Sequence, residues 1–452
     1  MEKIRELITS LPVRKDNYLL LRECKLSTSN LPELRSTLRE ADYHLVLQLA
    51  SFNASGFVRE YAINEMQVLK VDGCLPYLLF RLGDWVTEVR TRAAAAYRAS
   101  LIPKNLPELL AHLPILWRVL KVQRVNLERI RADTVAFCLD EHRTTTLRHY
   151  PTLPDNSRLF LAHELVKHPL TREEVNLLLS DSNFMVRQQL VTAYDQLIPE
   201  HVEQLCRDKS ARVRGLFLQR KVENTANHAW LTPYLTDRSA NIRNLARYYL
   251  SLTGIDAGEV YRNNLRKQQD IVGSLLGLYD LAEQTDVPLI ESFLSYPDPS
   301  VVKTAVFALS KVGSTAVAKW VMEDFLRLNI RYHKALRVYL NRQATATVTN
   351  RLMEYYPEAD TGKQLFLLRL FAQAGGYDKM PYFLRGLRHT DVRVRTVAHQ
   401  YIADWRKQMT NVFYPASPAV REEVKYQLRL LDQLPSGTID TEAIKDLDFY
   451  FR

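Results

Sequence analysis

Residues 208–214 read Asp-Lys-Ser-Ala-Arg-Val-Arg, and this short stretch sets the architecture of the chain. Its elements are an Asp, an Arg six residues later, and a Val or Ile directly before that Arg. The same spacing occurs in four pairs, Asp84/Arg90, Asp181/Arg187, Asp208/Arg214 and Asp237/Arg243. The last three arginines follow one another at intervals of 27 and 29 residues. A motif that returns about every thirty residues predicts a helical repeat architecture.

The residue types of the motif indicate what each one does. An Asp in the turn between two helices can accept hydrogen bonds from free N–H groups at the start of the second helix. The Val or Ile is the first core residue of that helix. The Arg has the reach and the donors to bind the Asp or a turn carbonyl of the neighbouring repeat. The four pairs therefore predict a ladder that holds successive repeats in register.

The repeat around Asp181 predicts both helices of one unit. Thr171 and Glu174 have the spacing of a capping box, which places the start of a first helix there. A turn follows at 180–183, and a second helix is expected from about Phe184 to Ile198. The apolar residues of 186–198 recur at helical spacing, and the proline that comes next ends the helix.

A known family carries the same motif. The Asp, five residues, Arg pattern with Val or Ile before the Arg resembles the HEAT repeat, and the short period is similar to bacterial HEAT-like repeats of the phycobilisome-lyase type. The resemblance implies an all-α, right-handed superhelical α-solenoid of roughly a dozen helix pairs. It also implies a concave face, lined by the second helices, that binds a protein partner.

Weaker copies extend the pattern over most of the chain. They are Asn53/Arg59, Asp298 with Lys303, the run 390–395, and 420–421, and missing copies are expected near 272, 334 and 364. The predicted organisation is capping helices at 1–50, a repeat array at 51–253 with an irregular stretch near 105–165, a second array at 254–434, and a tail or cap at 435–452.

Composition narrows the class of protein. The chain has 452 residues, of which 46% are hydrophobic, and only 14 glycines. Its four cysteines are far apart with no CxxC spacing, which favours a reducing compartment, the cytoplasm, over a disulfide framework. No leader or long apolar run is seen, so no membrane insertion is expected. His163 and His168 are five residues apart, whereas a helical zinc motif needs four, and no cofactor or metal site is predicted.

The charge suggests a second kind of partner. The formal net charge is +10, and the excess gathers in two basic bands, 201–250 and 303–351. Such bands can follow a polyanion, so nucleic-acid binding is the alternative to a protein partner. The candidate contacts are Arg327, Arg331, Lys334, Arg337 and Arg342. Many of these cations are equally expected on solvated helix faces or as structural arginines of the repeat.

One enzyme class shares the repeat. Alkylpurine DNA glycosylases are built from HEAT-like repeats and use a Trp and an Asp one helical turn apart. Trp320 and Asp324 have that spacing inside the second basic band. By this resemblance Asp324 would stabilise positive charge on a departing base, and Trp320 would contact that base. The chain is about twice as long as those enzymes, and the pair fits equally well as a packed Trp with Asp324 bound to Arg327 or Arg331.

These observations lead to an ordered set of expectations. The first is a non-enzymatic scaffold or adaptor that binds a protein partner. The second is a nucleic-acid-binding protein that uses the basic bands. The third is a DNA glycosylase that uses Trp320 and Asp324.

Overall fold

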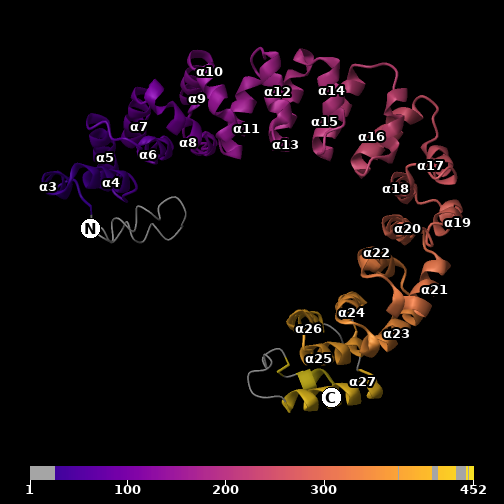
Figure 1. Cartoon of the computed structure of the whole chain (residues 1–452). Coiled ribbons are helices and arrows are strands. Elements are labelled where there is room, and N and C mark those ends of the chain that lie inside the picture. Colours follow the sequence, from indigo (N-terminus) through magenta and orange to yellow (C-terminus); the bar gives the residue numbers. More distant parts are fainter. Residues whose placement is uncertain (1–25, 375, 410–415, 434–443, 446, 452) are drawn as a thin grey trace. The chain divides into compact units, whose positions relative to one another are not determined.

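The computed structural model describes residues 26–374, 376–409, 416–433, 444–445 and 447–451. Within these residues all regular structure is helical and no β-strand occurs, so the prediction of an all-α fold is confirmed. The chain divides into two compact units, Met1–Asn224 and Thr225–Arg452 (Figure 1). The boundary lies before the predicted one at 253/254. Residues 1–25 of the expected N-terminal cap and most of the expected tail lie outside the described residues.

The first unit is a succession of short helices. They are α3 Asn30–Thr37, α4 Glu40–Ala50, α5 Gly56–Val68, α6 Leu75–Arg81, α7 Thr87–Ala99, η1 Pro103–Asn105, α8 Leu106–Val119, α9 Glu128–Val135, η2 Ala136–Glu141, α10 Arg143–His149, η3 Tyr150–Thr152, α11 Asp155–Leu165, α12 Arg172–Ser180, α13 Phe184–Arg187, η4 Gln188–Gln196, α14 Pro199–Cys206 and α15 Ala211–Glu223.

Pairing in this unit follows chain order. The first helix of a pair leads into the Asp turn and the second helix begins after it, as α6 and α7 do around Asp84. Helix α4 packs against α5 and α6 against α7, while α5 also packs against α7, the second helix of the next pair. The pairs bury residues such as Leu47, Leu79 and Tyr97, which are inaccessible to solvent. The apolar stripe of each helix therefore finds its partner on an adjacent helix.

The stretch near 105–165 departs from the regular pairing. Helix α8 has Pro114 in its interior, α9 runs directly into the π-helix η2, and α10 has only seven residues. A proline inside a helix removes a backbone hydrogen bond, and a π-turn shifts the helical register, so both change the period.

The repeat around Asp181 follows its prediction in the first helix but not in the second. Thr171 and Glu174 form the capping box of α12, as predicted. The expected second helix from Phe184 to Ile198 is wrong in its length. Only α13 is α-helical, and the 3₁₀ segment η4 follows, with non-helical dihedral angles at Ala193. Two consecutive β-branched residues, Val191 and Thr192, lower the helix propensity at this point.

The second unit continues the succession. Its helices are η5 Ala229–Thr236, α16 Ala240–Ser251, α17 Ala257–Arg266, α18 Ile271–Leu281, η6 Gln284–Asp286, α19 Val287–Glu291, α20 Pro299–Val312, α21 Thr315–Asp324, η7 Phe325–Arg327, η8 Ile330–Tyr332, α22 His333–Gln343, α23 Ala346–Tyr355, η9 Tyr356–Glu358, α24 Thr361–Ala374, η10 Tyr377–Lys379, α25 Met380–Leu387, α26 Val392–Met409, α27 Pro418–Asp432 and η12 Leu447–Phe451.

Two rows contain most of the longer helices of this unit after α17. One row, called here the second-helix row, consists of α18, α20, α22, α24 and α26, and each of these helices packs against the next. Helices α18, α22 and α24 begin close to residues 272, 334 and 364, where copies of the motif are missing from the sequence.

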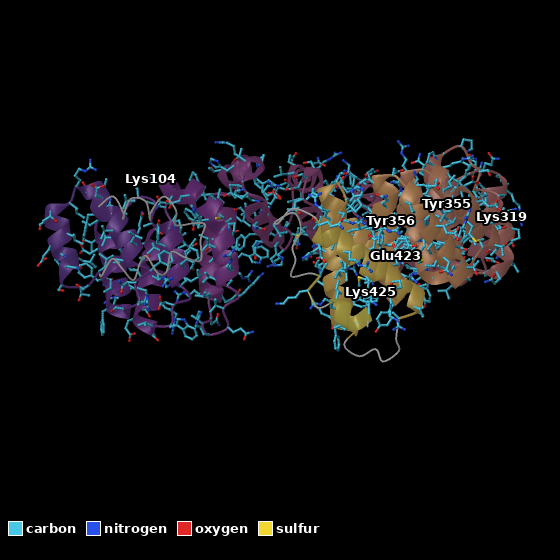
Figure 2. All side chains as sticks on the ribbon, turned by 90° about the horizontal axis from the view of Figure 1, so that it is seen from below. Lys104, Lys319, Tyr355, Tyr356, Glu423 and Lys425 are labelled. Atoms are coloured by element: carbon cyan, nitrogen blue, oxygen red, sulfur yellow. The ribbon has the colours of Figure 1, made fainter. Side chains whose placement is uncertain are left out.

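The other row contains α21, α23, α25 and α27. Tyr355 of α23 donates to the Met322 carbonyl of α21, and Arg385 of α25 pairs with Glu423 of α27 at 2.7 Å. Tyr355 and Glu423 are labelled in Figure 2.

Two glycines allow α18 to pack closely. A Cβ atom at Gly273 would lie 2.3 Å from the Thr236 carbonyl oxygen, and one at Gly277 would lie 2.4 Å from the Tyr261 ring. Any larger residue would push α18 away from η5 and α17, so these positions require glycine for close approach.

The described residues of the C-terminal tail cover the last repeat. Leu447 and Phe451 are inaccessible to solvent, and the Phe451 ring stacks on Trp405 with 5.7 Å between centroids. Tyr377 meets the same ring edge-on at 5.4 Å. The tail therefore completes the apolar core at this end of the unit.

No helix in the described ranges has the length and the apolar character needed to cross a membrane.

Candidate functional site

The motif arginines bind both their own turn and the following repeat. Arg187 Nη1 donates to the carbonyl of Asp181, six residues earlier, at 2.7 Å. Its Nε and Nη2 donate to the two carboxylate oxygens of Asp208, in the next repeat, at 2.6 and 2.8 Å. The carboxylate of Asp208 also accepts from the N–H of Ser210, which precedes the second helix. The turn carbonyl thus belongs to the arginine's own repeat, and the carboxylate belongs to the following one.

Parts of this arrangement recur at the other pairs. Arg90 donates to the Asp84 carbonyl, Arg214 to the Asp208 carbonyl and Arg243 to the Asp237 carbonyl, each at 2.7 Å. The carboxylate of Asp84 accepts from Arg59 at 2.7 and 2.9 Å. Arg59 comes from one of the weaker copies, whose turn has Asn in place of Asp.

Some partners were not predicted from the sequence. Arg243 binds Asp280 at 2.8 and 3.0 Å, and Arg247 binds the same carboxylate at 3.0 Å. Asp280 lies 37 residues after Arg243 and has no motif around it, so only tertiary packing identifies it. Arg158 binds Asp181 at 2.8 Å, although Ser157 stands where the motif has Val or Ile.

One copy uses another residue type in the Asp position. His389 Nδ1 accepts from the Asp391 N–H at 2.9 Å, and Arg395 Nη1 donates to the His389 carbonyl at 2.7 Å. His389 is six residues before Arg395, so the spacing alone would have identified it. Asp391 instead pairs with Arg393 at 2.7 Å.

Hydrogen bonds from arginine side chains and backbone N–H groups lower the pKa of the ladder carboxylates Asp84 and Asp208. Burial alone would raise the pKa of Asp84, but hydrogen bonds from Arg59 and the Val86 N–H hold it below its usual value. The pKa of Asp208 is likewise lowered, because the hydrogen bonds from Arg187 and the Ser210 N–H outweigh burial. Both groups are therefore ionised at neutral pH and act as structural anions.

The first basic band, 201–250, is largely occupied within the fold. Arg207 and Lys221 both pair with Glu203, at 2.8 and 3.1 Å, and Arg220 pairs with Glu223 at 3.2 Å. Arg214 and Arg243 belong to the turns described above. Within the described residues, Lys209, Arg212 and Arg238 of this band form no ion pair and remain available to a polyanion.

The five candidate contacts of the second basic band, 303–351, fall into three groups. Arg327, Arg331 and Lys334 lie in or next to the connection between α21 and α22, and Arg327 pairs with Asp324 at 3.8 Å. Arg342, at the end of α22, donates to the hydroxyls of Tyr279 and Ser310 at 3.4 and 3.3 Å. Arg337 lies in the middle of α22.

The candidate glycosylase pair lies in the other row of helices. Trp320 and Asp324 are on α21, which packs against α23. The Trp320 ring is 5.7 Å from that of Tyr332, and Asp324 is bound to Arg327. The geometry matches a packed tryptophan and a surface ion pair, and the two residues do not line the pocket described below.

One position in the second-helix row carries a distinct set of side chains. Each of its five helices carries one of these side chains, at intervals of 28, 30, 32 and 32 residues along the chain. They are Tyr279 on α18, Phe307 on α20, Arg337 on α22, Arg369 on α24 and Tyr401 on α26. None of the five is buried. We call this set the stripe. Along adjacent helices it has two aromatic side chains, then two arginines, then a tyrosine.

At one end the stripe is an aromatic pair surrounded by cations. The rings of Tyr279 and Phe307 are 4.3 Å apart, and the Lys311 ammonium lies 4.3 Å from the Tyr279 ring centre. Arg342 approaches the Tyr279 hydroxyl. A cation over an aromatic face is an attractive contact that leaves positive charge at the surface.

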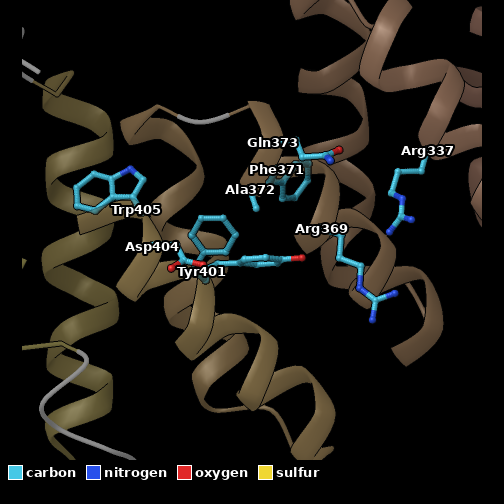
Figure 3. Close-up of a pocket in the computed structure, with 9 residues that line it drawn as sticks. Arg337, Arg369, Phe371, Ala372, Gln373, Tyr401, Asp404 and Trp405 are labelled. Carbon is cyan, nitrogen blue, oxygen red and sulfur yellow. The ribbon is translucent and has the colours of Figure 1, made fainter. Parts of the chain in front are cut away.

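At the other end the stripe borders a pocket of about 240 Å³. Its lining residues come from α22, α24, α25 and α26, and they are Arg337, Arg369, Phe371, Ala372, Gln373, Phe383, Tyr401, Asp404 and Trp405. Figure 3 shows the Tyr401 hydroxyl directed toward Arg369, with Arg337 extending into the same space from the neighbouring helix. Phe371 and Phe383 are buried and form an apolar base.

The charges in this pocket are unbalanced. Within the described ranges, neither Arg337 nor Arg369 forms an ion pair with a carboxylate. The carboxylate of Asp404 already accepts from Gln400 at 3.0 Å and pairs with Lys407 at 3.5 Å. Burial raises the pKa of Tyr401, and the two guanidiniums oppose this shift. The Tyr401 hydroxyl stays protonated at neutral pH and is available as a donor.

In the described part of the chain, no three His, Cys, Asp or Glu side chains form a group that could hold a metal ion. His163 Nδ1 is 3.2 Å from Gln189 Oε1, and its ring packs on Trp117 at 5.3 Å.

Comparison with known proteins adds little to this geometry. No protein-family model matches the chain, and no curated protein matches it. Among solved structures, it is similar to an engineered protein whose crystal structure was determined by a structural genomics consortium. The sequence identity is 13%, the match covers 99% of this chain and 98% of that chain, and the TM-score is 0.20. Neither a family nor a function follows from a similarity at this level.

Proposed function

We propose that this chain is a non-enzymatic binding protein of the HEAT-like type, built as a right-handed superhelical α-solenoid. Its partner is an acidic segment of another protein, which lies along the stripe. The observation that carries the proposal is a pair of arginines, Arg337 and Arg369, at the same position of adjacent helices, which have no carboxylate partner among the residues that the structure describes. The free thiols of Cys74, Cys138 and Cys206 support a reducing compartment such as the cytoplasm.

The stripe also fits an extended segment in size. Adjacent helices pack about 8–10 Å apart, so five helices span roughly 40 Å. An extended chain covers about 3.3–3.6 Å per residue, and roughly 12 residues therefore reach from Tyr279 to Tyr401. Side chains of such a segment meet two aromatic groups, then two arginines, then a tyrosine, which favours acidic residues flanked by apolar ones.

Fluorescence anisotropy tests the proposal on the whole chain. The probe is a labelled Glu- and Leu-containing peptide of roughly 12 residues, matched to the span of the stripe. The double variant Arg337→Glu, Arg369→Glu should bind it at least about tenfold more weakly, because two attractive charges become repulsive. Arg327→Glu is the control, since Arg327 is 89% exposed and lies outside the stripe. Equal losses in both variants, or no binding by the wild type, would reject the proposed surface.

A second candidate partner is single-stranded nucleic acid. Aromatic rings next to cations form the kind of surface on which bases stack while phosphates are neutralised. Labelled single-stranded RNA, single-stranded DNA and duplex DNA, measured at about 50 and 200 mM salt, test this alternative. Tight binding of a single strand that survives the higher salt and is lost in the double variant would favour nucleic acid over protein.

A further inference from the structure

We infer that the pocket between Arg337, Arg369 and Tyr401 is a subsite for a phosphate monoester, carried on a phosphorylated side chain of the partner segment. This inference rests on the proposed function and assigns the chemistry of its strongest contact.

The donors around the pocket outnumber its acceptors. Two guanidiniums, the Tyr401 hydroxyl and the Gln373 amide offer N–H and O–H groups, while Asp404 is already held by Gln400 and Lys407. Arginine presents its donors in a planar fork that matches the oxygens of a phosphoryl group. The set therefore favours an anion with several acceptor oxygens.

The amount of positive charge selects among anions. A carboxylate carries one negative charge and would leave one of the two guanidiniums unmatched. A phosphate monoester carries about −1.5 to −2 charges at neutral pH and has three acceptor oxygens. A phosphodiester, as in a nucleic-acid backbone, carries only one charge per phosphate. Two adjacent arginines thus fit the monoester best.

The shape of the pocket supports an anchored group at this point. Its volume is about 240 Å³, and its base is formed by the buried rings of Phe371 and Phe383. The base of the pocket therefore carries no polar group, and charge-assisted hydrogen bonds are stronger in apolar surroundings. Phe383 also packs against the Tyr401 ring of α26 at 5.8 Å, which holds that donor in place before a ligand arrives.

Peptide binding to the full chain gives the main test. The acidic peptide described above is compared with the same peptide carrying one central phosphoserine. The phosphorylated form should bind wild-type protein about tenfold more tightly, since two charge-assisted contacts are gained. That preference should disappear in Arg337→Ala and in Arg369→Ala, and should shrink in Tyr401→Phe. The control Arg327→Ala should keep it.

Each outcome separates the subsite from the proposed function. If both peptides bind equally and with measurable affinity, the proposal of an acidic protein partner is retained and the phosphate subsite is rejected. The subsite is also rejected if the preference survives in Arg369→Ala. If a single-stranded oligonucleotide displaces the phosphopeptide more effectively than unlabelled phosphopeptide does, the ligand class is nucleic acid instead.

Binding of inorganic phosphate gives a second test that does not need the peptide. Phosphorus NMR line broadening with wild-type protein, lost in Arg337→Ala and Arg369→Ala, supports the subsite even where the acidic peptide fails to bind. Absence of broadening with the wild type overturns it.

Discussion

Arginine has opposite roles in two regions of this chain. In the first unit, Arg187 uses Nε, Nη1 and Nη2 to bind its own turn and the Asp208 carboxylate. In the second unit, Arg337 and Arg369 project from the second-helix row without an ion pair in the described ranges. Net charge alone therefore does not locate a binding surface. The arginines available to a partner are those that the fold leaves without a carboxylate.

The largest expected loss of stability comes from replacing a deeply buried ladder carboxylate. Asp84 accepts from both Arg59 and Arg81, and its side chain is 2% exposed. Asp84→Ala should lower the free energy of unfolding by about 3–5 kcal/mol, because two guanidiniums lose their buried partner. Urea unfolding followed by circular dichroism measures the change.

Asp72→Ala is the matched control for this prediction. Asp72 pairs with Lys104 at 2.9 Å, but both side chains are more than 70% exposed. Its removal should cost less than about 1 kcal/mol. Similar losses in the two variants would remove the distinction between ladder pairs and surface pairs.

The next effect concerns a ladder arginine. Arg187→Ala should lower the free energy of unfolding by about 1–3 kcal/mol, because Asp208 and the Asp181 carbonyl lose charged hydrogen bonds. Arg207→Ala is the comparison, since Arg207 is 75% exposed although it pairs with Glu203. Hydrogen exchange should rise at the turns 181–183 and 208–210 only in Arg187→Ala. Unchanged exchange there would contradict a role in holding the repeats in register.

Acid should weaken the ladder before it affects the stripe arginines. The folded-state pKa values of Asp84 and Asp208 are lowered, so their stabilising effect is present above the unfolded-state value near 4 and is lost as pH falls through the folded-state value. The stability difference between wild type and Asp208→Asn should therefore be largest near pH 6–7 and shrink below about pH 4. Denaturation midpoints across this range measure it, and a constant difference would refute the assignment.

The stripe arginines should contribute least to stability, in contrast to the ladder arginine Arg187. Arg337→Ala and Arg369→Ala should change the free energy of unfolding by no more than about 0.5 kcal/mol, because neither side chain forms an ion pair with any residue that the structure describes. The same variants should lose the phosphopeptide preference. A loss of stability as large as that of Arg187→Ala would place these arginines among the structural ones.

Sequence reasoning predicted the helices better than the site. The Asp–Arg spacing and the capping box at Thr171 are local, so short-range geometry fixes them. The second helix after Asp181 was predicted too long, because periodicity does not report the cost of two adjacent β-branched residues. Arg337 was among the candidate contacts, whereas Arg369 and Tyr401 were not, although the intervals of 32 residues could have identified both.

Short-range patterns in the sequence are enough to predict that the described part of this chain is all-helical, that its helices recur about every thirty residues, and where Asp and Arg stand at the turns. These properties depend on hydrogen bonds and side-chain spacing within a few residues. Tertiary packing sets which carboxylate each arginine meets, such as Asp280 for Arg243, and which arginines have none among the described residues. Those outcomes depend on distances between helices about thirty residues apart in the chain, and packing of the helix rows sets them.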